Sequence, residues 1–417
     1  MNYLESEELE HLTERVILVG VMEQEDEDTE SSLDELGELA DTAGAVVVGR
    51  LIQKREKIHP GTYIGKGKLE ELQDLIAGTS ATGIICDDEL SSVQMHHLQE
   101  ALECKIMDRT LLILDIFAKH ARSSEGKIQV ELAQLKYRAS RLSGLGKSLS
   151  RLGGGIGTRG PGEKKLEMDR RLIRTRISHL KQELDEVVRH RDVIRASREK
   201  SGQKMAALVG YTSVGKSAIF KRMTGADVLE DAKLFATLDT TTRGVPMSSG
   251  QELLLVDTVG FIRKLPANLV DAFKSTLEEA RYADILIHVV DASSPQMEVQ
   301  MATVYETLRE LSIGEKPVIT VFNKQDLLEN PGSFRDFQAE ASIPTSARTG
   351  QGLDKVLEAA EEILRKDKIY IERVIPFDQG GLVQLIRKKG ELLQEEYLPE
   401  GIFVKAYVSQ ELYGKLL

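Results

Sequence analysis

The sequence predicts an α/β protein in four parts: a small parallel α/β domain, a helical hairpin, a larger parallel α/β domain and a small C-terminal α/β domain. Short apolar runs alternate with helical patterns, first between residues 15 and 107 and again between 204 and 366. From Thr110 to Leu142 and again from Leu166 to Lys200, apolar residues recur every three or four positions. A glycine-rich loop, Gly210 to Ser217, stands between an apolar run and the start of a helix.

Size and composition indicate a chain with packed cores. It has 417 residues, enough for two to four domains, and 41% of them are hydrophobic. Its two cysteines, Cys86 and Cys104, offer neither a disulfide framework nor a zinc pattern. The N-terminus is acidic, unlike a signal peptide, and no apolar run approaches the roughly 18 residues of a membrane span. We therefore expect a cytoplasmic protein with no transmembrane segment.

Charge is distributed unevenly along the chain. The net charge is −12, which argues against nucleic acid as a partner if the charge is spread evenly. Residues 1–40, however, hold fourteen acidic side chains and one basic one, whereas residues 119–200 hold twenty-one basic and ten acidic ones. Such asymmetry indicates a polyanion as partner of the basic segment.

The first predicted domain covers residues 1–112. Its apolar runs predict strands at 15–21, 45–51, 83–86 and 104–107, with helices near 32–42, 67–77 and 91–102. Because strand and helix alternate, a small parallel sheet is expected. The stretch from Gly65 to Lys68 could hold an anion, but a simple entry into a helix is the favoured interpretation.

Residues 113–203 are expected to form a basic helical hairpin. Its first helix is interrupted at Ser123–Gly126, and its second runs from Leu166 to Lys200. The loop expected between them, residues 143–165, contains a formal G-x-G-x-x-G. We reject a dinucleotide site because these glycines follow a charged helix and not a strand. Either the loop is a flexible linker, or it binds a phosphate backbone through its basic residues Arg151, Arg159, Lys164 and Lys165.

The third domain, residues 204–366, begins with a phosphate loop. The motif G-x-x-x-x-G-K-[ST] is matched without exception and lies between a strand at 205–209 and a helix that starts at Ser217. Backbone N–H groups of such a loop surround phosphates, Lys216 reaches the β- and γ-phosphates, and Ser217 binds Mg²⁺. The predicted nucleotide-binding residues here are Gly210, Tyr211, Thr212, Ser213, Val214, Gly215, Lys216 and Ser217.

A carboxylate motif follows the next apolar run, residues 252–256. It reads Asp257, Thr258, Val259, Gly260. At the end of a second strand, Asp257 stands where phosphate-loop proteins place a carboxylate near Mg²⁺, and the N–H of Gly260 can meet the γ-phosphate. A simple turn is the alternative interpretation of this motif.

Two later motifs predict selectivity for guanine. Asn323, Lys324, Gln325 and Asp326 follow the apolar run at 317–322. The Asp326 carboxylate can accept hydrogen bonds from N1–H and the 2-amino group of guanine, which adenine does not offer. Lys324 can lie along the base, and Asn323 can brace the phosphate loop. Ser346, Ala347 and Arg348 stand in order behind this motif, where a serine and a backbone N–H would meet the guanine O6.

Together these four motifs resemble the GTP-binding domain of small and translational GTPases. Over nearly its whole length the chain is similar to the HflX family of ribosome-associated GTPases, most distinctly at residues 61–68, 129–135 and 153–163. The stretch Phe235, Ala236, Thr237, Leu238, Asp239 resembles the first switch of that family. The resemblance implies that Thr237 binds Mg²⁺ together with Ser217, although Thr240, Thr241 and Thr242 compete for this role. It implies Lys216, Thr237 and Gly260 as catalytic residues.

The resemblance also implies a function. The expected protein is a monomeric GTPase that binds the large ribosomal subunit and its rRNA, hydrolyses GTP to GDP and phosphate, and splits or rescues stalled or idle ribosomes under stress. A ribosome assembly factor and a signalling switch that recruits a protein partner remain alternatives.

Three features qualify this expectation. Phe261 follows Gly260 where many small GTPases carry the glutamine that orients water, so slow intrinsic hydrolysis is expected. Ser213 stands where potassium-activated relatives often carry asparagine, which leaves potassium dependence open. Residues 367–417 predict a small α/β domain, with strands near 370–376 and 403–408 and a helix near 380–390, and with no catalytic motif.

Overall fold

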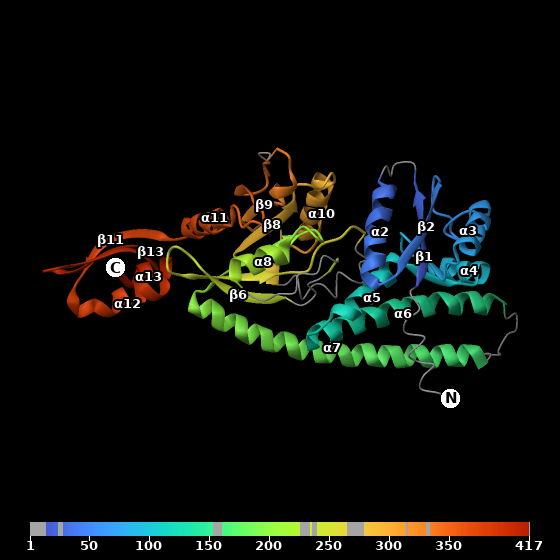
Figure 1. The fold of residues 1–417 in the computed structure, drawn as a ribbon. Coiled ribbons are helices and arrows are strands. Elements are labelled where there is room, and N and C mark those ends of the chain that lie inside the picture. Colours follow the sequence, from blue (N-terminus) through green and yellow to red (C-terminus); the bar gives the residue numbers. More distant parts are fainter. Residues whose placement is uncertain are drawn as a thin grey trace, which may run out of the picture. The chain divides into compact units, whose positions relative to one another are not determined.

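The computed structural model describes most of the chain (Figure 1). The described residues are 14–23, 28–152, 161–225, 234–235, 240–264, 279–313, 316–330 and 334–416. They form two compact units. The first unit contains Met1–Val187 together with Ala232–Ala236 and Arg263–Phe273, and the second contains the remainder. The α/β class expected from the sequence is confirmed, and the division into four domains stays a prediction.

The first unit contains a four-stranded sheet in which all neighbouring strands are parallel. Its order is β2-β1-β3-β4, with bounds β1 (Arg15–Met22), β2 (Val46–Lys54), β3 (Gly83–Cys86) and β4 (Lys105–Asp108). The helices that alternate with these strands are α2 (Thr29–Ala43), α3 (Lys66–Thr79), α4 (Ser92–Leu102) and α5 (Arg109–His120). Central strands β1 and β3 are almost entirely apolar, as expected for strands covered on both faces.

Alternate residues of β1 contribute to one apolar core. Ile17, Val19 and Val21 pack into a core with side chains of α3 and α4, such as Leu72 and Leu98. Helix α3 begins at Lys66, directly after Gly65, so a helix does start at this motif, and the preference for a simple helix entry over an anion site stays a prediction.

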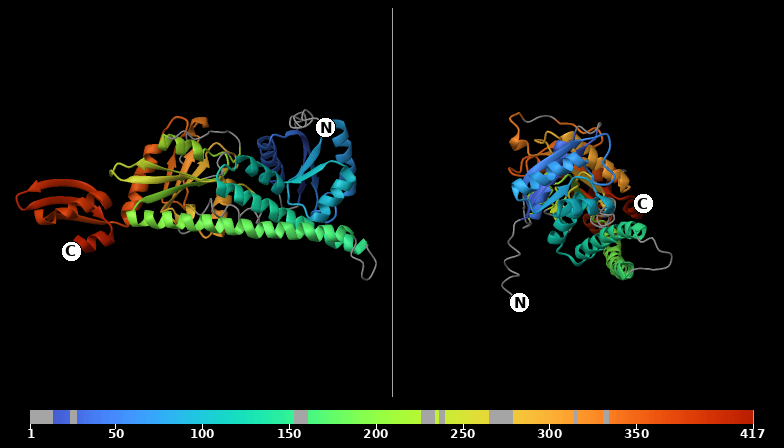
Figure 2. Two further views of the ribbon diagram at one scale, coloured as in Figure 1. Left: turned by 90° about the horizontal axis from the view of Figure 1, so that it is seen from below. Right: turned by 90° about the vertical axis from the view of Figure 1, so that its right-hand side faces the viewer.

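A helical hairpin follows, most of which belongs to the first unit, while its residues 188–201 belong to the second. Helix α6 (Ser124–Leu152) and helix α7 (Pro161–Ser201) lie side by side and antiparallel (Figure 2). Arg176 of α7 donates to Glu131 of α6 at 2.7 Å, and Arg170 donates to the Leu142 carbonyl at 2.6 Å. Among the described residues, no helix is long and apolar enough to cross a membrane.

The predicted loop at 143–165 is wrong in extent. Helix α6 continues to Leu152, and α7 already begins at Pro161. Proline is favoured at the first helical position, and the cost of Gly144 and Gly146 within α6, about 1 kcal/mol each, did not end the helix. Arg151 therefore lies on α6, and Lys164 and Lys165 lie on α7. Arg159 falls outside the described residues.

The second unit is built on a six-stranded sheet of order β10-β9-β8-β5-β7-β6. The strands are β5 (Lys204–Gly210), β6 (Thr241–Pro246), β7 (Glu252–Asp257), β8 (Ile285–Asp291), β9 (Val318–Asn323) and β10 (Ala341–Pro344). All pairs are parallel except β6 with β7. Helices α8 (Lys216–Thr224), α10 (Met297–Glu310) and α11 (Leu353–Lys366) belong to this unit. The phosphate loop and the two later motifs therefore all leave carboxyl ends of parallel strands.

A three-stranded antiparallel sheet of order β11-β13-β12 follows in the same unit. Its elements are β11 (Ile369–Ile375), α12 (Gly380–Lys389), β12 (Glu391–Leu398), β13 (Gly401–Val408) and α13 (Gln410–Leu416). Val383 and Ile386 of α12 pack with Val404 and Ala406 of β13. Glu391 is 2% exposed and binds Arg365 at the end of α11.

Candidate functional site

The phosphate loop joins β5 to α8 in the way that the sequence predicts. Gly215 has φ +98°, a conformation that side chains other than glycine rarely adopt. A Cβ at this position would lie 2.4 Å from Nδ2 of Asn323, so the contact excludes any larger residue. Ser213 also has a positive φ, +57°. Sharp turns of this kind let the N–H groups of a phosphate loop converge at the start of the following helix.

Lys216 is buried beneath this loop. Its Nζ donates to the carbonyl oxygens of Gly210 at 3.1 Å and Tyr211 at 2.5 Å. Burial lowers the pKa of Lys216 to about 8, while the nearby Asp257 opposes this shift. An anionic phosphate beside the amine would stabilise its charged form.

Ser217 and Asp257 bring two oxygen donors together. The Ser217 hydroxyl donates to Oδ2 of Asp257 at 2.7 Å, and Asp257 is fully buried at the end of β7. Oxygen atoms of this kind suit Mg²⁺, which keeps several waters and takes few protein ligands. The residues present therefore fit the expected cation.

The segment that follows Asp257 lies directly on the phosphate loop. A Cβ at Gly260 would lie 2.9 Å from Cα of Thr212 and 3.0 Å from Nζ of Lys216. Phe261, 3% exposed, closes two backbone hydrogen bonds with the loop: Thr212 N–H donates to the Phe261 carbonyl at 2.8 Å, and Phe261 N–H donates to the Gly210 carbonyl at 3.0 Å. Phe261 is thus a core side chain that offers no polar group to water.

Asn323 ties three loops together. Its Nδ2 donates to the Val214 carbonyl of the phosphate loop at 2.8 Å, and its Oδ1 accepts from the Ala347 N–H at 2.9 Å. The Ser346 hydroxyl donates to Oδ1 of Asp326 at 2.6 Å. Because Asn323 is 1% exposed, both of its hydrogen bonds lie out of water, where the loss of either would leave a buried polar group unpaired.

A cavity of about 720 Å³ opens between these loops. Asp326, Lys324, Ala347 and Arg348 line it together with Gly215 and Ala218. The cavity is large enough for a purine base, and both the carboxylate of Asp326 and the side chain of Lys324 border it.

One residue of this site was missed by the sequence reasoning. Asp291 ends β8, and its Oδ2 binds Nζ of Lys324 at 2.7 Å. Its Oδ1 accepts from the backbone N–H of Ser293 at 3.0 Å and from the Ser293 hydroxyl at 2.6 Å. The sequence does contain a feature that points to Asp291, because this carboxylate directly follows an apolar strand, as Asp257 does.

The first-switch residues are only partly described. Phe235 belongs to the first unit, where its ring meets Phe117 at 4.7 Å between centroids. Ala236, Thr237, Leu238 and Asp239 fall outside the described residues, so the expected Mg²⁺ ligand Thr237 has no structural account. Thr241 and Thr242, two of its rivals, lie on β6 and pair with β7.

Comparison with protein families covers most of the chain. A family described as "GTP-binding GTPase N-terminal" matches residues 30–118, and "GTP-binding GTPase Middle Region" matches residues 120–198. A third family, "50S ribosome-binding GTPase", matches residues 205–324.

Close relatives match nearly end to end. A protein of Lacrimispora saccharolytica named GTPase HflX is 59% identical over 98% of this chain and 97% of its own length. A GTPase HflX of Escherichia coli is 41% identical over 88% of this chain and 87% of its own. Among solved structures, a GTP-binding protein of Sulfolobus solfataricus in complex with GDP is 25% identical, with a TM-score of 0.43, and covers 85% of this chain and 99% of that one.

Proposed function

The chain belongs to the HflX family of GTPases, and from this premise we propose that it binds the large ribosomal subunit and couples GTP hydrolysis to the splitting or rescue of stalled or idle ribosomes under stress. The family membership establishes GTP hydrolysis. The ribosomal partner, its rRNA, the action under stress, the cytoplasmic location and the monomeric state are the proposal.

The observation that carries this proposal is the charge of the helical hairpin. Residues 119–200, which include most of α6 and α7, hold twenty-one basic and ten acidic side chains in a chain whose net charge is −12. Phosphate backbones attract such a segment without base-specific contacts. The proposed RNA contacts are Arg151 near the end of α6, Lys164 and Lys165 near the start of α7, and Arg159, which falls outside the described residues.

In the proposed mechanism, the nucleotide is held by three loops. Lys216 and the loop N–H groups bind the phosphates, Asp326 with Ser346 binds guanine, and Lys324, held by Asp291, lies along the base. Ser217 and Thr237 would hold Mg²⁺, and Asp257 accepts from the Ser217 hydroxyl. When bound, Mg²⁺ would neutralise charge that develops on the phosphates.

Hydrolysis needs a polar group that orients the attacking water, and among the described residues the position after Gly260 does not offer one. Phe261 is buried and apolar, so it cannot orient the attacking water. We propose that the ribosomal subunit completes the site, either by ordering the segment around Thr237 or by supplying a polar group.

Co-sedimentation with purified large subunits tests the proposal. The full chain with a non-hydrolysable GTP analogue should sediment with the subunits more than the chain with GDP does. Replacing Arg151, Arg159, Lys164 and Lys165 by Gln should weaken binding and flatten its dependence on salt, because counterion release falls with each lost phosphate contact.

A matched control removes the same number of charges elsewhere. Lys54, Lys57, Lys355 and Lys388 are all exposed, and their joint replacement by Gln should leave sedimentation unchanged. If both variants lose the same amount of ribosome binding, the overall charge of the chain and not the hairpin explains the loss. No nucleotide-dependent sedimentation of the parent chain would reject ribosome binding.

A further inference from the structure

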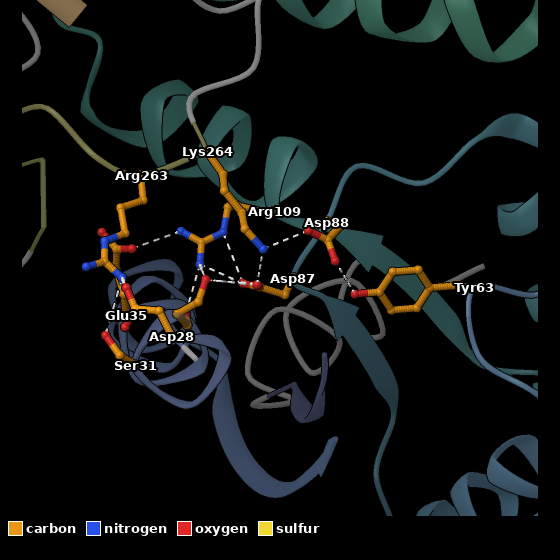
Figure 3. Close-up of polar contacts among 10 residues, drawn as sticks. Asp28, Ser31, Glu35, Tyr63, Asp87, Asp88, Arg109, Arg263 and Lys264 are labelled. Carbon is orange, nitrogen blue, oxygen red and sulfur yellow. Dashed lines mark hydrogen bonds and ion pairs between the residues drawn. The ribbon is translucent and has the colours of Figure 1, made fainter. Parts of the chain in front are cut away.

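A buried ionic cluster lies at the carboxyl ends of β3 and β4 (Figure 3). Arg109, 1% exposed, donates through Nε and Nη2 to Oδ1 of Asp87 at 3.2 and 2.6 Å, and through Nη1 to Glu35 at 3.1 Å. Asp87 is also 1% exposed. Burial alone raises the pKa of Asp87, but Arg109 and then Lys264 outweigh it, so this pKa lies below its usual range. Asp87 is therefore ionised and fixed in position.

The neighbouring Asp88 is fixed by a residue from the distinctive stretch 61–68. The hydroxyl of Tyr63, which is 1% exposed, donates to Oδ2 of Asp88 at 2.6 Å (Figure 3). Tyr63 has φ +66°, a strained conformation that persists only where the surroundings impose it. The stretch thus holds one carboxylate in place, a role that nucleotide binding does not explain.

Both carboxylates bind a residue that follows the D-x-x-G motif. Nζ of Lys264 lies 2.6 Å from Oδ2 of Asp87 and 2.7 Å from Oδ1 of Asp88. The preceding Arg263 forms an ion pair with Asp28. Lys264 itself has φ +51°, which costs about 1 kcal/mol for a residue other than glycine. The ion pairs therefore hold this segment in a strained conformation.

A second segment between the nucleotide motifs is held in the same unit. Leu234 and Phe235 are each 3% exposed, the Leu234 N–H donates to Oγ1 of Thr42 at 3.3 Å, and the Phe235 ring packs edge-on against Phe117 of α5. Phe235 also has a positive φ, +58°. Residues 234–235 and residues 263–264 lie next to the two segments that contact a γ-phosphate in GTPases. Both pairs are thus fixed by contacts outside the nucleotide site.

Because only three residues separate Lys264 from Gly260, fixing Lys264 limits how far Gly260 can move. Gly260 lies so close to Lys216 and Thr212 that not even a methyl group fits between them. A γ-phosphate bound by both Lys216 and the Gly260 N–H must occupy this space. The Lys216 side chain can shift, but Cα of Thr212 is backbone, so Gly260 has to withdraw from the loop when GTP binds, whereas GDP makes no such demand.

We propose that Asp87 and Asp88 are positioning residues for the GTPase reaction: by holding Lys264, they oppose the withdrawal of Gly260 and so disfavour GTP relative to GDP. Tyr63 and Arg109 serve this role indirectly, because they orient the two carboxylates. GTP binding and release of Lys264 are then coupled, and each promotes the other.

The test compares two affinities of the full chain. Lys264→Ala and Asp88→Asn should each raise the affinity for a non-hydrolysable GTP analogue over that for GDP by at least about fivefold, the lower end of typical coupling between sites. GDP affinity should stay the same. The double variant should show no further gain, since both substitutions break one interaction. Tyr63→Phe should shift the ratio in the same direction by a smaller factor.

Lys105→Ala is the matched control, because Lys105 forms a 2.6 Å ion pair with Glu14 on the surface of the same unit. Its ratio of affinities should equal that of the parent chain. A thermal melt identifies any variant that fails to fold, and Asp87 is left intact because of its burial with Arg109. An unchanged ratio in folded Lys264→Ala, or weaker binding of the GTP analogue, would overturn the proposal.

Discussion

Replacing Asp326 by Asn should convert the site from guanine to xanthine. The Ser346 hydroxyl donates to Oδ1 of Asp326 at 2.6 Å. An asparagine can keep this bond through its carbonyl oxygen, which turns its NH₂ group toward the base. Guanine then loses an acceptor for two donors, whereas the 2-carbonyl of xanthine gains a donor.

The magnitude follows from the bonds lost. Two hydrogen bonds to a charged acceptor are each worth about 1.5–3 kcal/mol, and the lower value applies because Asp326 is exposed. A loss of about 3 kcal/mol weakens GDP binding by roughly 100-fold.

Fluorescence titration with labelled GDP and labelled XDP measures both affinities. Ser346→Ala is the control: it should weaken GDP binding without favouring XDP, since it removes only the orienting contact. If Asp326→Asn keeps GDP affinity within about threefold of the parent, the assignment of guanine recognition to Asp326 is wrong.

The other predictions concern the phosphates, the base, pH and activation. Lys216→Ala should abolish turnover, because a charge-assisted phosphate contact is lost; unchanged single-turnover hydrolysis contradicts the proposed role of the phosphate loop. Asp291→Ala should raise KM for GTP several-fold with little change in kcat, because it frees Lys324; steady-state kinetics decides. Burial lowers the pKa of His288 to about 4, so this side chain stays neutral while an unfolded one gains a proton near pH 6.5. As the pH falls from 6.5 to 4, the free energy of unfolding should decrease by up to about 3 kcal/mol more in the parent chain than in His288→Gln. Denaturant unfolding at several pH values measures this, and identical pH profiles of the two proteins would reject it. Finally, isolated protein should hydrolyse GTP slowly and large subunits should accelerate it; fast single-turnover hydrolysis by the full chain alone would exclude a need for activation.

Local signals let the sequence predict the strands that lead to the nucleotide loops. Strands β5, β8 and β9 are continuous apolar runs, because parallel central strands are covered on both faces. The sequence missed β6 and β12, which lie at sheet edges. Strand β6 contains glycine and proline, and β12 contains three glutamates, so neither shows the apolar pattern of a buried strand.

Side-chain pairing over long distances could not be predicted. Lys264 is 177 positions from Asp87, and neither residue stands in a pattern that points to the other. The ends of the hairpin helices also differ from the expectation, because glycine and serine between residues 143 and 152 are typical of a loop, although the flanking leucines and lysines favour a helix. Local composition predicts elements, whereas the tertiary fold decides which polar groups meet.

The close contact between Gly215 and Asn323 has an evolutionary consequence. A Cβ at position 215 and an amide at position 323 cannot coexist at 2.4 Å, and the amide in turn holds the loops of Val214 and Ala347. A side chain at position 215 therefore requires a smaller residue at position 323, and that change would remove the hydrogen bonds to Val214 and Ala347. Evolutionary change at positions 215 and 323 should therefore be coupled, because a single substitution at either position disturbs the phosphate loop.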